Sequence, residues 1–291
     1  MTQAAHPLGA KARRPKLPAA FRRSKGLIGA GLVLLIFATA LLAPVFIPDD
    51  WATKMDMRAR LSPPSLAHPL GTDQLGRDLM FRVLLGAQTS VYIATAAVFL
   101  SMVIGLPLGL ISGYVGRTTD NVLMRLVDTL LSFPALLLAL TISAVLGPNL
   151  QNTIIAIGVA FTPFLARIIR GETLRVAQMP YVEAARTAGN SDLRLIVHHI
   201  LPNIMPAVIV QCTISLAFAI LAEAGLSFLG LGTQPPDASW GLMIQASRDY
   251  LDRAPWTALV PGAAVAITVL GLNMFGDALR DALDPRSKGG A

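Results

Sequence analysis

Long uninterrupted blocks of apolar residues are the feature that most limits how this chain can fold. The first block runs from Leu27 to Ile47 without a charged residue. A helix of about 20 apolar residues matches the roughly 30 Å hydrocarbon core of a bilayer. Only 14% of the residues are charged, against roughly 25% in ordinary soluble domains, so a water-soluble fold of this size would lack polar surface. The sequence therefore predicts an integral membrane protein.

The apolar blocks divide the chain into predicted spans and polar connections. After residues 27–47, further spans are predicted at about 90–113, 122–146, 152–170, 204–229 and 257–279. Because backbone groups in hydrocarbon must be hydrogen-bonded within the segment or within a closed barrel, and the alternating pattern of a barrel strand is not seen, we expect helices. The predicted fold class is an all-α integral membrane protein with six transmembrane helices.

The basic residues predict the orientation of these spans. The chain has a net charge of +7, and 17 of its 24 lysines and arginines fall in segments that are cytoplasmic if the N-terminus is inside. This bias follows the positive-inside rule. We therefore expect cytoplasmic tails at 1–26 and 282–291, and extracytoplasmic loops at 48–89 and 230–256. The placement also explains the positive charge without a nucleic-acid partner.

Three local features leave alternatives open or carry little information. Ala38-Thr39-Ala40 resembles a signal-peptide cleavage box, but the apolar run continues beyond it, so an uncleaved span is favoured. Gly105, Gly109 and Gly113 recur at a spacing that brings helices close together. We expect ordinary bundle packing there, with a dimerisation face as the alternative. The lone Cys212 excludes an intramolecular disulfide.

The polar stretch 171–203 lies between two predicted spans on the cytoplasmic side and carries helix signals. Pro180 suits the first turn of a helix and Gly189 its C-terminal turn. Ser191 or Asp192 could cap a second helix, which we expect to end before Pro202. The sequence predicts two short helices joined at a glycine, forming a knob on the cytoplasmic face.

This stretch resembles the signature loop of ABC importer permeases, in which a glutamate and two alanines precede a glycine and a later leucine-proline pair. The residues on that spacing here are Glu183, Ala184, Ala185, Gly189, Leu201 and Pro202. His199 stands where the general pattern has isoleucine, a departure common in permeases of the peptide subfamily. Segments 68–73, 76–78, 226–232 and 281–286 also resemble that subfamily. Over nearly its whole length beyond the basic tail, the chain is similar to C-type permease subunits of dipeptide, oligopeptide and nickel importers.

The resemblance implies a type I ABC importer permease fold, with a permease domain at about 88–281 and an ATPase-docking loop at 171–203. It also implies an assembly in the cell (inner) membrane. The implied partners are a second permease subunit, two ATP-binding subunits and an extracytoplasmic solute-binding protein. Import of di- or oligopeptides is the function implied most directly, with nickel complexes or another small solute as the alternative.

Other classes of function find less support in the residues. The chain contains no Gly-Lys dipeptide, so the phosphate-binding loop of an ATPase is missing and energy must come from another chain. The spans contain no Ser-His or His-Glu-x-x-His arrangement, which argues against an intramembrane enzyme. His198 and His199 point about 100° apart on a helix, so they are not expected to share a metal ion. We also expect no cofactor and no catalytic residue. An exporter is not excluded by hydropathy alone.

Several polar residues remain as weaker candidates. Glu223 is the ionisable residue deepest in a span, so it could line a path or pin a neighbouring helix. Asp128 could pair with Arg125 on its own helix. Residues 240–251 fit one face of a short helix at the membrane boundary, which could serve as an aromatic anchor or as part of an outer mouth that meets the binding protein. For the second role the candidate contacts are Gln245, Arg248 and Asp249.

Overall fold

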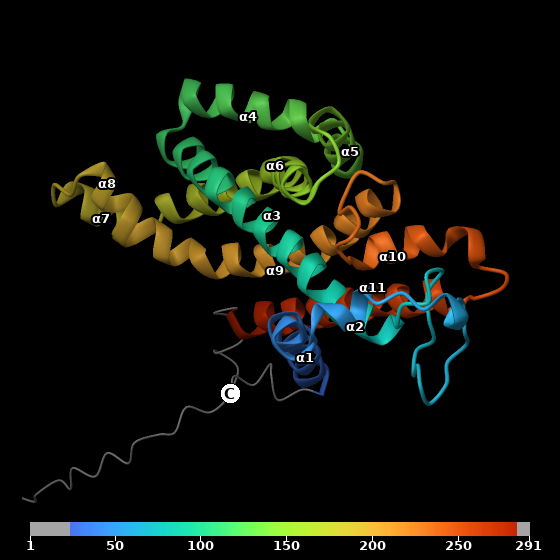
Figure 1. Cartoon of the computed structure of the whole chain (residues 1–291). Coiled ribbons are helices and arrows are strands. Elements are labelled where there is room, and N and C mark those ends of the chain that lie inside the picture. Colours follow the sequence, from blue (N-terminus) through green and yellow to red (C-terminus); the bar gives the residue numbers. More distant parts are fainter. Residues whose placement is uncertain (1–23, 284–291) are drawn as a thin grey trace, which may run out of the picture.

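A computed structural model describes residues 24–283 of the chain. These residues form a bundle of helices and contain no β-strand (Figure 1). Most of the predicted tails, 1–26 and 282–291, lies outside the described residues. The longer elements are α1 (Ser24–Phe46), α3 (Leu79–Val115), α4 (Arg117–Leu131), α5 (Ala135–Leu146), α6 (Leu150–Ala177), α9 (Leu201–Phe228) and α11 (Trp256–Leu283). The shorter ones are α2 (Asp49–Thr53), α7 (Pro180–Thr187), α8 (Asp192–Leu195) and α10 (Trp240–Ser247).

The described helices agree with six predicted spans when one bent pair is counted as a single span. Five stretches of helix are long and apolar enough to cross a membrane, and α4 with α5 makes the sixth. The span predicted at 122–146 is not one continuous helix, because α4 and α5 meet at an angle of 85°. Pro134 lies at this break in an extended conformation. Proline has no N–H to donate and disfavours helix in the residue before it, so the chain turns there.

Among the described helices, α3 and α6 make the most extensive contact. A Cβ atom added to Gly109 would lie 2.6 Å from the carbonyl oxygen of Ala166, and one added to Gly113 would lie 2.7 Å from Cβ of Thr173. Both neighbours belong to α6 of the same chain. The glycine stripe therefore packs within the bundle, as expected, and not at a dimerisation face.

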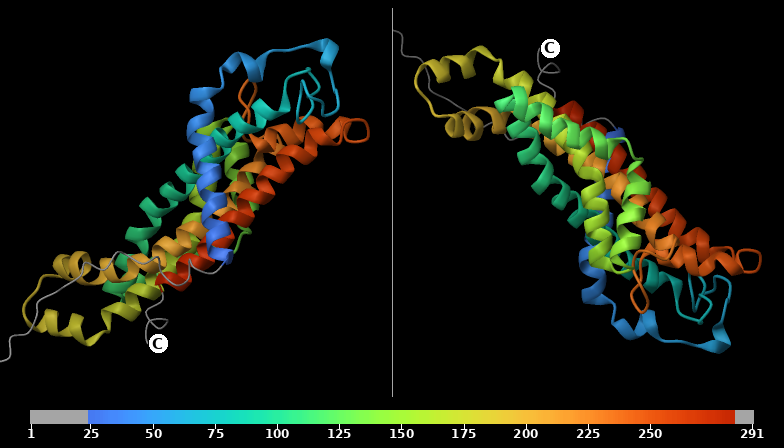
Figure 2. Two further views of the ribbon diagram at one scale, coloured as in Figure 1. Left: turned by 90° about the horizontal axis from the view of Figure 1, so that it is seen from below. Right: turned by 90° about the horizontal axis from the view of Figure 1, so that it is seen from above.

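Apolar side chains form two buried clusters. The larger one joins α1, α3, α6, α9 and α11 and includes Ile93, Ile157 and Leu226. The smaller one joins the ends of α3, α6 and α9 to the connection between α6 and α9. In Figure 2 this connection lies at one end of the elongated molecule, and segment 48–78 lies at the other. The two ends of the bundle are therefore structurally distinct.

Segment 48–78, together with the first turns of α3, forms a compact cap on the bundle. Helix α3 begins at Leu79, so the loop predicted at 48–89 is shorter than expected. Asp73 accepts hydrogen bonds from the backbone N–H of Arg77 and, at 2.6 Å, from its guanidinium. The buried polar residues of the cap are Thr72, Asp73, Arg77, Asp78 and Arg82. Trp256 of α11 donates to the carbonyl of Thr72 at 3.3 Å. These bonds fix the segment against the bundle.

Candidate docking knob, outer cap and polar groove

Residues 178–200 form the knob that the sequence predicts. Helix α7 begins at Pro180, and Gly189 follows it with φ of +83°, a conformation that L side chains rarely adopt. Val182, Leu195 and Ile200 have no exposed surface and belong to the smaller cluster. The knob is therefore not a loose connection, because its own core is continuous with α3, α6 and α9.

The residues of the signature spacing occupy different places on this knob. Glu183, Ala184 and Gly189 are exposed, while Ala185 is half-buried and packs against the smaller cluster. A Cβ atom added to Gly189 would have no heavy atom within 4 Å apart from those of its neighbours in the chain. The glycine is thus needed for the turn rather than for space. The exposed side of α7 offers a small-residue surface with an acidic group in its first turn.

A polar contact that the sequence analysis missed ties the knob to α3. The hydroxyl group of Tyr114 donates to Oδ1 of Asp192 at 2.5 Å. The guanidinium of Arg186 lies over the Tyr114 ring, 5.6 Å from its centroid, at a distance where cation–π attraction acts. Residues 78 positions apart give no local signal of such a contact, so only the structure reveals it.

The second helix of the knob does not end before Pro202, contrary to the prediction. Residues 196–200 form a π turn between α8 and α9, and the three pieces make one helical stretch from Asp192 to Phe228. The N–H of Leu201 bonds to the carbonyl of Ile196, five residues back. A π turn widens the helix locally, which leaves room for a proline that cannot donate. His199, Leu201 and Pro202 consequently lie where the knob continues into a span.

Glu223 lies fully buried in α9. Ser227 donates to its Oε1 at 2.8 Å, whereas Oε2 has no hydrogen-bond partner among the described residues. The hydroxyl groups of Ser90 and Ser239 lie close to the same carboxyl group. The N–H of Thr233 in turn donates to the Ser227 hydroxyl at 3.2 Å. These partners come from α3, α9 and the segment before α10. The geometry favours a role in pinning helices over a role in lining an open path.

Helix α10 confirms the short helix predicted after residue 239. Its first residue, Trp240, is however not a membrane anchor. Trp240 is only 3% exposed, and its Nε1 donates to the carbonyl of Val83 at 2.9 Å. The α10 helix packs on α9 and α11. Arg248 and Asp249 are exposed just beyond it, and Gln245 is half-buried. From the sequence alone, Trp240 is compatible both with burial inside the protein and with a position at the membrane–water interface.

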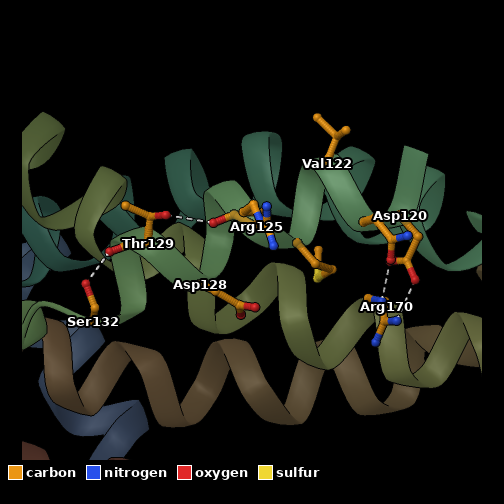
Figure 3. A pocket seen from close by; sticks show the side chains of 9 residues that line it. Asp120, Val122, Arg125, Asp128, Thr129, Ser132 and Arg170 are labelled. Carbon is orange, nitrogen blue, oxygen red and sulfur yellow. Dashed lines mark hydrogen bonds and ion pairs between the residues drawn. The ribbon is translucent and has the colours of Figure 1, made fainter. Parts of the chain in front are cut away.

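A polar groove of about 930 Å³ lies beside α4 and is shown in Figure 3. Arg170 of α6 donates to both carboxylate oxygens of Asp120, at 2.5 and 2.6 Å. Asp128 pairs with Arg167 of α6. The expected pair with Arg125 is therefore wrong, because the bend after α4 brings α6 within reach. Side chains of this second pair are more than half exposed.

The bundle of apolar helices and the knob between two of its spans define a multi-pass membrane protein with the fold of an importer permease. The family model for the binding-protein-dependent transport system inner membrane component matches residues 105–289. The chain belongs to this family and is a permease subunit of a transport system.

Comparison with individual proteins agrees with the family. The chain is 48% identical over 267 residues to a putative peptide transport system permease protein of Brucella suis, covering 92% of this chain and 90% of the relative. It is 43% identical over 278 residues to a di/tripeptide transport system permease protein of Pseudomonas aeruginosa, covering 93% and 91%. Among solved structures, an inward-facing methionine ABC transporter matches with a TM-score of 0.58 at 20% identity, covering 71% of this chain and 98% of the matched chain. This last likeness supports the fold.

Proposed function

We propose that this chain is the C-type permease subunit of an ATP-driven importer of di- or oligopeptides, and that its knob docks into a cleft of an ATP-binding subunit. The observation that carries the docking role is the exposed surface of α7 on a knob whose core is continuous with three spans. Movement of a docked partner would act on α3, α6 and α9 through Val182 and Ile200. Packed elements with two discrete arrangements can carry such coupling.

The remaining parts of the assembly follow from the same proposal. A second permease subunit would complete the translocation path, and a second ATP-binding subunit would pair with the first. The capped outer end, including Gln245, Arg248 and Asp249, would receive the loaded solute-binding protein. ATP would be hydrolysed by the partner subunits, and this chain would contribute no catalytic group. The alternative substrate within the same architecture is a nickel complex or another small solute.

The substrate class can be tested with the assembled transporter in lipid vesicles, supplied with its solute-binding protein. We expect ATP-dependent uptake of a dipeptide such as alanyl-phenylalanine, because the relatives over 90% of the chain are named as peptide permeases. A nickel–histidine complex serves as the competing solute. Uptake of the nickel complex without competition by dipeptides would contradict the peptide proposal while leaving the permease class intact.

The orientation is a separate proposal, with both termini in the cytoplasm. Reporter fusions after residues 60, 118, 148, 190 and 240 are expected to read out, in, out, in and out, since 17 of 24 basic residues then lie inside. The fusion at 148 also tests whether α4 and α5 cross the membrane together. A reading of "in" at both 118 and 148 would show that the bent pair is a re-entrant segment.

A further inference from the structure

The exposed faces of the bundle differ in chemistry. On α1 the large exposed side chains within the span are all apolar, namely Leu27, Ile28, Leu34, Leu35, Leu41, Leu42, Val45 and Phe46. On the opposite side, the spanning helix α6 exposes more than half of the Arg167 side chain, which pairs with Asp128. Charged groups within spans rarely face lipid. The α4–α6 side is therefore expected to border protein or water, whereas α1 suits lipid.

This same side contains a small pocket near the midpoints of α6 and α9. Its volume is about 290 Å³. The lining is mostly apolar and comprises Ala135, Phe161, Phe164, Gln211, Ser215 and Phe218. Gln211 donates to the hydroxyl of Ser215 at 3.4 Å, so both polar groups are held on one face of α9. Pockets that combine aromatic walls with a few polar groups are typical of small-molecule sites.

Gln211 also lines a second, polar groove of about 400 Å³. This groove runs toward the cytoplasmic ends of α6, α9 and α11 and is lined by groups of both charges. Glu172 is paired with Arg175 at 2.7 Å, and Arg280 is exposed at the α11 side. A zwitterionic peptide has one carboxylate and one ammonium group. The charges of the groove complement both.

We propose that Phe161, Phe164, Gln211, Ser215 and Phe218 form a transient binding site for a short peptide in the wall of the translocation path. This inference rests on the proposed function. An apolar side chain of the peptide packs between the aromatic rings, and the amide group of Gln211 hydrogen-bonds the peptide main chain. Glutamine supplies one acceptor and two donors, which match a main-chain N–H and carbonyl. The charged ends then face the polar groove.

The test uses cysteine labelling in the complete transporter, with Cys212 replaced by alanine. Single cysteines replace Ser215 in the pocket and, as the matched control, Ile209 on the same helix. Ile209 is 44% exposed, and at 100° per residue it lies about 120° around the helix from Ser215. A charged, membrane-impermeant thiosulfonate reagent is applied from both sides of the vesicles, with and without alanyl-phenylalanine.

We expect the reagent to modify Ser215→Cys at least about tenfold faster than Ile209→Cys, because Ser215 lines the proposed path and Ile209 lies on another face of α9. Alanyl-phenylalanine should slow the modification of Ser215→Cys and leave that of Ile209→Cys unchanged. In addition, Gln211→Leu should raise about tenfold the concentration of alanyl-phenylalanine that half-protects Ser215→Cys, the effect of one lost hydrogen bond. ATP-dependent uptake by the Cys212→Ala complex is measured first, and its absence contradicts the proposed function itself. With uptake present, equal labelling of the two cysteines or no protection by the peptide overturns the pocket.

Discussion

Replacing Gly109 with leucine is expected to prevent the accumulation of folded subunit. A Cβ at this position would lie 2.6 Å from the carbonyl oxygen of Ala166 and 2.6 Å from Cβ of Ile169. The first neighbour is backbone, so it cannot rotate away, and the remaining atoms of leucine would force α3 and α6 apart. Overpacking a dense core costs about 1–3 kcal/mol and occasionally more, and this contact is the most extensive between two described helices. A cost at the upper end of that range is expected.

The measurement is the yield of monodisperse subunit in mild detergent and its apparent melting temperature. Gly31→Leu is the matched control, because Gly31 lies in the exposed part of α1 and a Cβ there meets nothing within 4 Å. The control should behave as the unmodified chain. If Gly109→Leu gives the same yield and melting temperature as Gly31→Leu, the packing of α3 on α6 described here is incorrect.

Changing the knob should uncouple transport without unfolding the subunit. Glu183→Lys reverses an exposed charge in the first turn of α7, where an acidic group also suits the helix dipole. Gly189→Val places a β-branched residue at φ of +83°, where an L-residue costs about 1–2 kcal/mol. A loss of about 1.4 kcal/mol in docking free energy lowers affinity tenfold, and we expect uptake to fall at least about tenfold in either variant.

The readouts are substrate-stimulated ATP hydrolysis by the assembled complex in lipid and the amount of subunit in the membrane. Both variants should remain in the membrane, since the core residues Val182, Leu195 and Ile200 are untouched. Asp237→Lys is the control for charge reversal, because Asp237 is exposed in the loop before α10. Unchanged coupling in both knob variants would remove the docking role from this segment.

The sequence predicts the general architecture well because its signals are local. Apolar blocks of bilayer length indicate the spans, and the spacing around Glu183 and Gly189 indicates the knob. The contacts of Gly109 with Ala166 confirm that the glycine stripe serves packing within the bundle. Each of these features depends on residues close together in the chain.

The features that the sequence did not predict depend on contacts between distant segments or on whether a helix can accommodate a proline. Pro134 splits the third span into α4 and α5, whereas Pro202 lies in a continuous helix because a π turn precedes it. Hydropathy does not distinguish these two prolines. The partner of Asp128 is on α6, and Trp240 is buried by α3. Neither contact has a signature in the spacing of nearby residues.

Docking of the knob on an ATP-binding subunit is measured most directly by photo-crosslinking from the exposed surface of α7 in the complete transporter. Ala184 is small and exposed, so a photoreactive amino acid at this position should not disturb the knob's core. The same amino acid at Asp249, exposed at the opposite end of the bundle, is the control. We expect an adduct between position 184 and an ATP-binding subunit, and no such adduct from position 249. An ATP-binding subunit captured equally from both positions, or from neither, would contradict docking of the knob.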